Sequence, residues 1–72
     1  MKVNFEFTNK SGLVNMCQLE NILVEEMDDS VSIHADDYMM TIPGHIINQD
    51  HTDSTDSYML SDGSRLEIEN IG

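Results

Sequence analysis

Apolar and polar residues alternate one for one in several short stretches of this chain, and a period of two favours extended backbone over helix. Near the N-terminus, Val3, Phe5 and Phe7 are separated by single polar residues. Near the C-terminus, Leu66 and Ile68 alternate with charged residues in the same way. Such alternation is typical of strands that are buried on one face. The pattern therefore predicts a mainly β protein.

Turn-forming residues separate the alternating stretches. The Asp-Gly pair at 62–63 predicts a tight β-hairpin, because glycine readily adopts the positive φ that such a turn requires. The Pro-Gly pair at 43–44 marks a second turn, and the acidic pair at 36–37 divides two alternating stretches into the arms of a hairpin. The stretch 50–57 has no apolar residue, so we expect a solvated loop there, the least ordered part of the chain.

Segment 18–27 fits two structures. The stripe formed by Leu19, Leu23 and Met27 fits a helix, whereas the apolar run 22–24, bounded by polar and acidic residues, fits a strand. The strand is favoured, because the Asp-Asp-Ser sequence that follows then forms a turn into the next alternating stretch. A short helix is the alternative.

The length of the chain limits its organisation. Its 72 residues have room for one domain, 1–72, with a single thin core. We expect a small antiparallel sheet, or a barrel-like meander, of four to six short strands arranged as consecutive hairpins, with one short helix if segment 18–27 is helical. Exposed strand edges on so small a sheet favour pairing with another chain, including a homodimer.

The charge of the chain excludes several classes of function. Fourteen acidic residues against three Lys and Arg give a net charge of −11. Nucleic-acid binding depends on Lys and Arg that neutralise phosphates, so we expect no direct contact with nucleic acid and none with anionic membranes. No secretory signal or membrane span is visible, and the single cysteine, Cys17, cannot form an internal disulfide. These features predict a cytoplasmic protein.

No pattern in the sequence predicts a catalytic or metal site. Cys17 lies beside Met16, in an apolar neighbourhood typical of a small buried residue. The three histidines and Cys17 lack the spacing of a metal centre, and the acidic stretch 50–62 does not match a calcium-binding loop in the registers that start at Asp50 and at Asp53. We therefore expect no enzyme active site, no metal and no cofactor. A looser cation site at Asp50, Asp53, Asp56 and Asp62 is a weaker alternative.

The acidic residues carry the functional hypothesis. Residues two apart on a strand lie about 6.6 Å apart, close to two steps of the charge spacing along one strand of duplex DNA, about 3.4 Å. Two clusters flank the alternating stretch 31–35 at a separation of about 17 Å, and a further pair lies near the C-terminus. The predicted partner-binding residues are Glu25, Glu26, Asp28, Asp29, Asp36, Asp37, Glu67 and Glu69.

In size, charge and lack of catalytic machinery, the chain resembles phage-encoded DNA-mimic inhibitors, among them anti-restriction, anti-CRISPR and uracil-DNA-glycosylase-inhibitor proteins. The resemblance implies a protein that blocks a basic, nucleic-acid-binding enzyme or complex by occupying its cleft, in the host cytoplasm if the chain is phage-encoded. The alternative is a structural or adaptor module that forms a homo-oligomer through its Met and Ile surface and through β-edge pairing.

Overall fold

The chain folds entirely into strands and turns. The structure is a computed structural model that describes all residues from 1 to 72. It contains no helix, and its eight strands are β1 (Lys2–Thr8), β2 (Val14–Glu20), β3 (Leu23–Glu26), β4 (Ser30–Ala35), β5 (Tyr38–Pro43), β6 (Ile46–His51), β7 (Thr55–Leu60) and β8 (Arg65–Asn70). The predicted mainly β class is confirmed.

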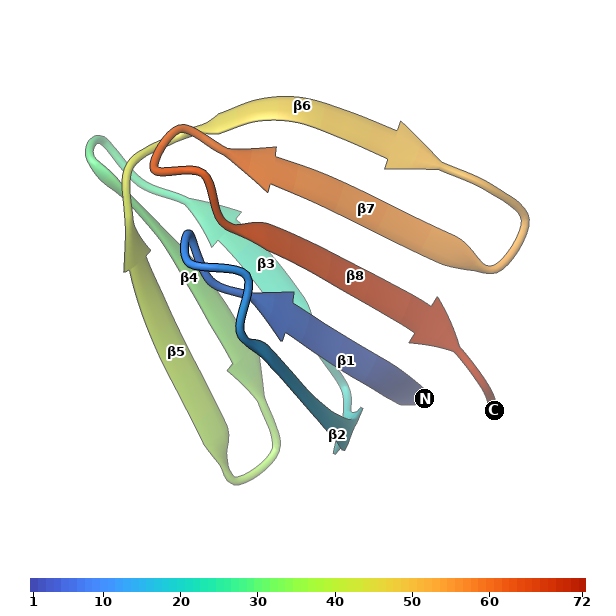
Figure 1. Cartoon of the computed structure of the whole chain (residues 1–72). Coiled ribbons are helices and arrows are strands. Elements are labelled where there is room, and N and C mark those ends of the chain that lie inside the picture. Colours follow the sequence, from blue (N-terminus) through green and yellow to red (C-terminus); the bar gives the residue numbers. More distant parts are fainter.

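The strands form two antiparallel sheets that lie in two layers (Figure 1). One sheet has five strands in the order β2-β1-β8-β7-β6, and the other has three strands in the order β3-β4-β5. All neighbours are consecutive in sequence except β1 and β8, which pair over the registers Val3 with Asn70 to Thr8 with Arg65. The larger sheet is therefore completed by the two ends of the chain.

The structure has eight strands, more than the predicted four to six, and one cause is the stretch 50–57. Stretch 50–57 is not a loop, because β6 extends to His51 and β7 begins at Thr55, so the turn covers residues 52–54 only. The polar residues of this stretch pair across the hairpin, with Asp50 opposite Ser57 and His51 opposite Asp56. Backbone hydrogen bonds hold such a ladder without apolar side chains. Segment 18–27 forms the end of β2 and all of β3, as the favoured interpretation predicted.

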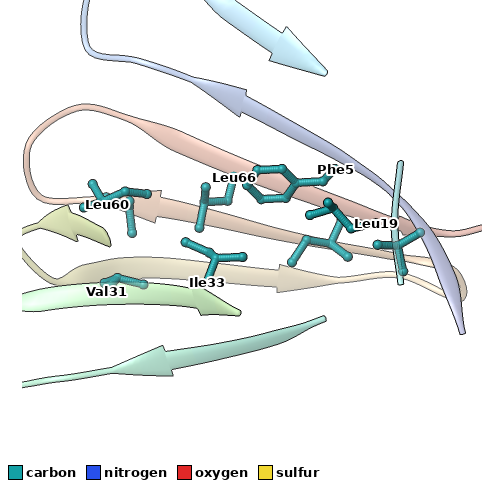
Figure 2. Close-up of a cluster of buried hydrophobic side chains, with 9 residues drawn as sticks. Phe5, Leu19, Val31, Ile33, Leu60 and Leu66 are labelled. Carbon is teal, nitrogen blue, oxygen red and sulfur yellow. The ribbon is translucent and has the colours of Figure 1, made fainter. Parts of the chain in front are cut away.

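The core lies between the two sheets (Figure 2). Phe5 of β1 is 2% exposed, and its ring meets the ring of Tyr38 on β5 edge to face, with the centroids 5.9 Å apart. The alternating residues predicted to face inward do so. The nine buried hydrophobic residues are Val3, Phe5, Leu19, Val31, Ile33, Ile42, Leu60, Leu66 and Ile68.

Cys17 is exposed, so the prediction that it is a buried core residue is wrong. It lies opposite Phe5 in the register of β1 and β2, which places it on the inner face of the five-stranded sheet. The second layer covers β2, an edge strand, at Leu19 but not at Cys17. An open cleft of about 340 Å³ remains there, lined by Phe5, Phe7, Asn15, Met16, Cys17, Tyr38 and Met40.

The predicted Asp-Gly hairpin joins β7 to β8 and is confirmed. Gly63 has a φ of 94°, and Gly63 N donates to the carbonyl of Leu60. The Asp62 Oδ1 atom accepts hydrogen bonds from both the backbone N–H, at 2.9 Å, and the hydroxyl of Ser64, which is 1% exposed. These bonds, helped by the nearby Lys10 charge, hold the pKa of Asp62 below its usual value of 3.8.

Replacing Asp62 with asparagine should remove one acid-sensitive contribution to stability. Because the pKa of Asp62 is lowered in the folded state, the stabilisation by its charge is complete above the unfolded pKa and is lost as pH falls through the folded pKa. The stability difference between wild type and Asp62→Asn should therefore shrink between pH 6 and pH 2, as measured by urea unfolding. A difference that stays constant with pH would contradict this role of the charge.

Candidate anionic binding surface

The eight carboxylates predicted from the sequence lie in three places. Two clusters lie at opposite ends of β4, as their spacing implies, because the turns before and after an antiparallel strand are at its two ends. The third group lies on the other layer, on β8 in the five-stranded sheet. The first cluster is Glu25, Glu26, Asp28 and Asp29, the second is Asp36 and Asp37, and the third is Glu67 and Glu69.

Several carboxylates of the first two groups are engaged within the molecule. The Glu26 Oε2 atom accepts a hydrogen bond from the backbone N–H of Ile46 at 2.9 Å and so fixes the start of β6. The Asp36 Oδ2 atom accepts from the side-chain amide of Asn21 at 3.0 Å. Glu25 lies 3.9 Å from the ring of His34. Some of these carboxylates therefore hold the ends of the three-stranded sheet through contacts within the molecule.

The register of the five-stranded sheet adds acids to the third group. Glu6 on β1 is directly opposite Glu67 on β8. Ser57 on β7 is the next residue in this row, and Asp50 on β6 lies opposite Ser57. Since residues opposite one another in a sheet share a face, the row runs across four strands on the side away from the core. Neighbouring strands are about 4.8 Å apart.

We call this surface the outer acidic face. Its acids are Glu6, Glu20, Asp50, Glu67 and Glu69, and its cations are Lys2 and Arg65. Three of the five acids were absent from the predicted set. For Glu6 the alternation of the first strand indicates an outward direction, but only the pairing of the first and last strands reveals the acid opposite it. Asp50 was missed because its stretch was taken for a loop.

No acid of the molecule is paired with Lys or Arg. The ion pairs within 4.0 Å join the N-terminal amine to Glu20, His34 to Glu25 and His51 to Asp56. None involves Lys or Arg, so the strongest cations of the chain compensate no carboxylate at this distance. Glu6 and Glu67 thus face one another as like charges on the neighbouring interior strands β1 and β8. Directly opposed like charges destabilise a sheet.

Glu67→Gln should therefore raise the stability of the protein. Removing one charge from the Glu6–Glu67 pair is expected to contribute about 0.2–1 kcal/mol, which for a domain of this size raises Tm by up to about 4–8 °C. The matched control is Asp53→Asn, which removes the same charge from the β6–β7 turn. The gain should shrink as NaCl screens the repulsion. A lower Tm for Glu67→Gln at low salt would contradict this expectation.

The alternative cation site is not assembled in the fold. Asp56 lies on the inner face of its sheet, where it is bonded to His51, whereas Asp50 lies on the outer face. Asp62 lies in the turn at the other end of β7. No group of three or more His, Cys, Asp and Glu side chains is arranged to hold a metal ion. The weaker prediction of a site at Asp50, Asp53, Asp56 and Asp62 therefore has no geometric support.

Comparison with known proteins finds no relative of this chain. No protein-family model, curated protein or solved structure matches the chain. The structure also contains no helix that is long and apolar enough to cross a membrane. The charge and geometry of the surface are therefore the guide to its function.

Proposed function

We propose that the protein binds a basic, nucleic-acid-binding protein through the outer acidic face and inhibits it by taking the place of DNA. The observation that carries this proposal is the row of acids that crosses the five-stranded sheet with no Lys or Arg paired to it. A surface that serves only for solubility mixes both signs of charge, whereas this face carries five acids against two cations. Here Glu6 and Glu67 are opposed at a cost in stability, which is typical of a functional surface.

The geometry of the face suits this role. Glu67 and Glu69 are two residues apart on one strand, about 6.6 Å, and Glu6 lies one strand away from Glu67, about 5 Å. Duplex DNA carries its charges about 3.4 Å apart along each strand. The face can therefore present carboxylates at intervals comparable to one or two phosphate steps. The strands β1 and β8 are both interior to the sheet, so the backbone beneath these carboxylates is stiff.

The inhibitor acts by occupation, without a chemical step and without a cofactor. Its partner is a nucleic-acid enzyme or complex whose cleft carries Lys and Arg, and complementary charge speeds association and disfavours wrong partners. Such a role agrees with the resemblance to anti-restriction and anti-CRISPR inhibitors and would operate in the cytoplasm where those enzymes act.

Reversing two charges of the face should abolish this binding. Glu67→Lys/Glu69→Lys places two cations opposite the basic partner, and like charges across an interface cost several kcal/mol, so affinity should fall at least about tenfold. The immobilised protein is incubated with bacterial lysate at about 50 mM and about 200 mM NaCl. Retained proteins are then eluted with excess duplex DNA and identified.

The matched control is Asp28→Lys/Asp29→Lys, which changes the net charge equally in the β3–β4 turn. The proposal is supported if DNA elutes a nucleic-acid-binding protein from the wild type and the control at low salt, but not from the variant of the face. It is wrong if DNA elutes nothing, if the variant of the face and the control behave alike, or if retention does not depend on salt.

A further inference from the structure

One edge of this acidic molecule carries almost no negative charge. Residues 7–19 and 38–49 contain no Asp or Glu, and these two segments supply nearly all of β2 and all of β5. Both strands are edges of their sheets, and both line the open cleft that exposes Cys17. The acid-free segments, far apart in the sequence, thus meet on one side of the fold.

Large apolar side chains are exposed on this side. Val14 and Met16 of β2 are 52% and 68% exposed, and Leu13, just before β2, is 66% exposed. On β5, Met40 lines the cleft, whereas Met39, which is 70% exposed, lies opposite His34 on the outer face of its sheet. Single exposed apolar residues are ordinary on a protein surface, but a group of them along one uncharged strand and cleft is typical of an interaction site.

β2 is the only one of the four edge strands that lacks protection against pairing. β3 has four residues, two of them acidic. β5 ends in Pro43, and β6 is interrupted by a bulge between Ile46 and Asn48 and carries Asp50. Short length, charge, proline and bulges are the means by which proteins block edge strands. β2 has seven residues in regular register with β1 and no charge before Glu20.

We propose that β2 pairs in antiparallel fashion with β2 of a second copy of this chain, so that the two five-stranded sheets join into one. This inference does not depend on the proposed function, although β2 borders the outer acidic face, where Met16 lies opposite Glu6 and Glu20 opposite Lys2. The occupant is a second copy because the edge is self-complementary in both apolar character and charge.

The self-pairing register follows from the position of Cys17. Cys17 is the central residue of Val14–Glu20, so a symmetric pair places it opposite Cys17 of the second copy. Glu20 then lies opposite Val14 and Met16 opposite Gln18, so no two acids oppose one another. The two Glu20 residues are six positions apart along the pair, about 20 Å, which exceeds the Debye length of about 8 Å at physiological salt.

Charges at the two ends of β2 complement one another in the same arrangement. Asp36 N donates to the carbonyl of Glu20 at 3.0 Å, so the β4–β5 turn with its two aspartates lies at the C-terminal end of β2. The β1–β2 turn with Lys10 lies at the N-terminal end. Antiparallel pairing places the turn that carries Lys10 in each copy at the same end of the pair as the turn that carries Asp36 and Asp37 in the other copy. A chain with a net charge of −11 thereby associates through its least acidic side.

The test measures the monomer–dimer equilibrium by sedimentation equilibrium of the purified full chain. Met16→Glu introduces a charge into the centre of the proposed pair and should raise the dimer dissociation constant at least about tenfold. Met16 is already exposed and its replacement leaves the core intact, but the new acid lies opposite Glu6, so urea unfolding is used to verify that the variant is folded. The matched control is Ile47→Glu, the same kind of change on the β6 edge, where Ile47 is 65% exposed. This control should dimerise as the wild type does.

Two further readouts separate this dimer from other associations. A short bismaleimide reagent should link wild-type chains through Cys17, but not chains of Cys17→Ser/Asn48→Cys, whose cysteine lies on β6. Added NaCl should strengthen the dimer by screening its net charge, whereas the proposed binding to a basic partner weakens with salt. A wild type that stays monomeric at millimolar concentration, or a dimer lost in Ile47→Glu but kept in Met16→Glu, overturns the inference.

Discussion

Phe5→Ala should lose about 3–5 kcal/mol of stability, the largest effect of any single substitution considered for this protein. Phe5 is the largest of the fully buried side chains. Its ring lies between the two sheets and meets Tyr38 of the opposite layer. Removing the ring leaves a cavity that the small core cannot close, and small domains have only about 5 kcal/mol or little more to lose.

Urea unfolding followed by circular dichroism measures this loss. The matched control is Phe7→Ala on the same face of β1, because Phe7 is only partly buried and borders the open cleft. Its replacement removes the same atoms without enclosing a cavity and should cost clearly less. Equal losses for the two variants would show that Phe5 does not have the central position in the core that the structure gives it.

Gly44→Ala should lose about 1–3 kcal/mol, the second largest effect. Gly44 has a φ of 113°, a conformation that side chains rarely adopt. A Cβ atom there would also overlap the Ser61 Oγ atom, which accepts a hydrogen bond from His45 N at 2.8 Å. The substitution therefore strains the backbone and disturbs the contact between the β5–β6 connection and the β7–β8 turn.

The two causes can be measured separately. Gly12 has a φ of 89° and no atom within 4 Å of the site of a Cβ, so Gly12→Ala reports backbone strain alone. Ser61→Ala removes the atom that the new Cβ would overlap. Adding Gly44→Ala to Ser61→Ala should therefore cost less stability than adding Gly44→Ala to the wild type. A Gly44→Ala protein with the Tm of the wild type would contradict both causes.

The faces of the strands were predictable from the sequence, whereas much of their pairing was not. Alternation gave the inward direction of Phe5 and Leu66 correctly, since the direction of a side chain in a strand depends on local order alone. The pairing of β1 with β8 joins residues 57 to 67 positions apart, and no local pattern encodes it. The prediction of a loop at 50–57 was wrong for a related reason, because backbone pairing can form strands from polar residues.

The candidate site was likewise predictable only in part. The composition gave the net charge, and the clusters at the two ends of β4 followed from their spacing. The opposition of Glu6 and Glu67 depends on the sheet register and could not be read from the sequence. Cys17 was placed wrongly because apolar neighbours in sequence do not reveal how far the second layer extends.

The pairing of the first strand with the last also affects how the chain is made. A nascent chain can form the β1–β2 and β4–β5 hairpins early, but β1 keeps an open edge until residues 65–70 have been synthesised. Closing so long a loop is slow compared with forming hairpins. During that interval the exposed edge is available to other chains, and the negative charge of the nascent polypeptide keeps such chains apart.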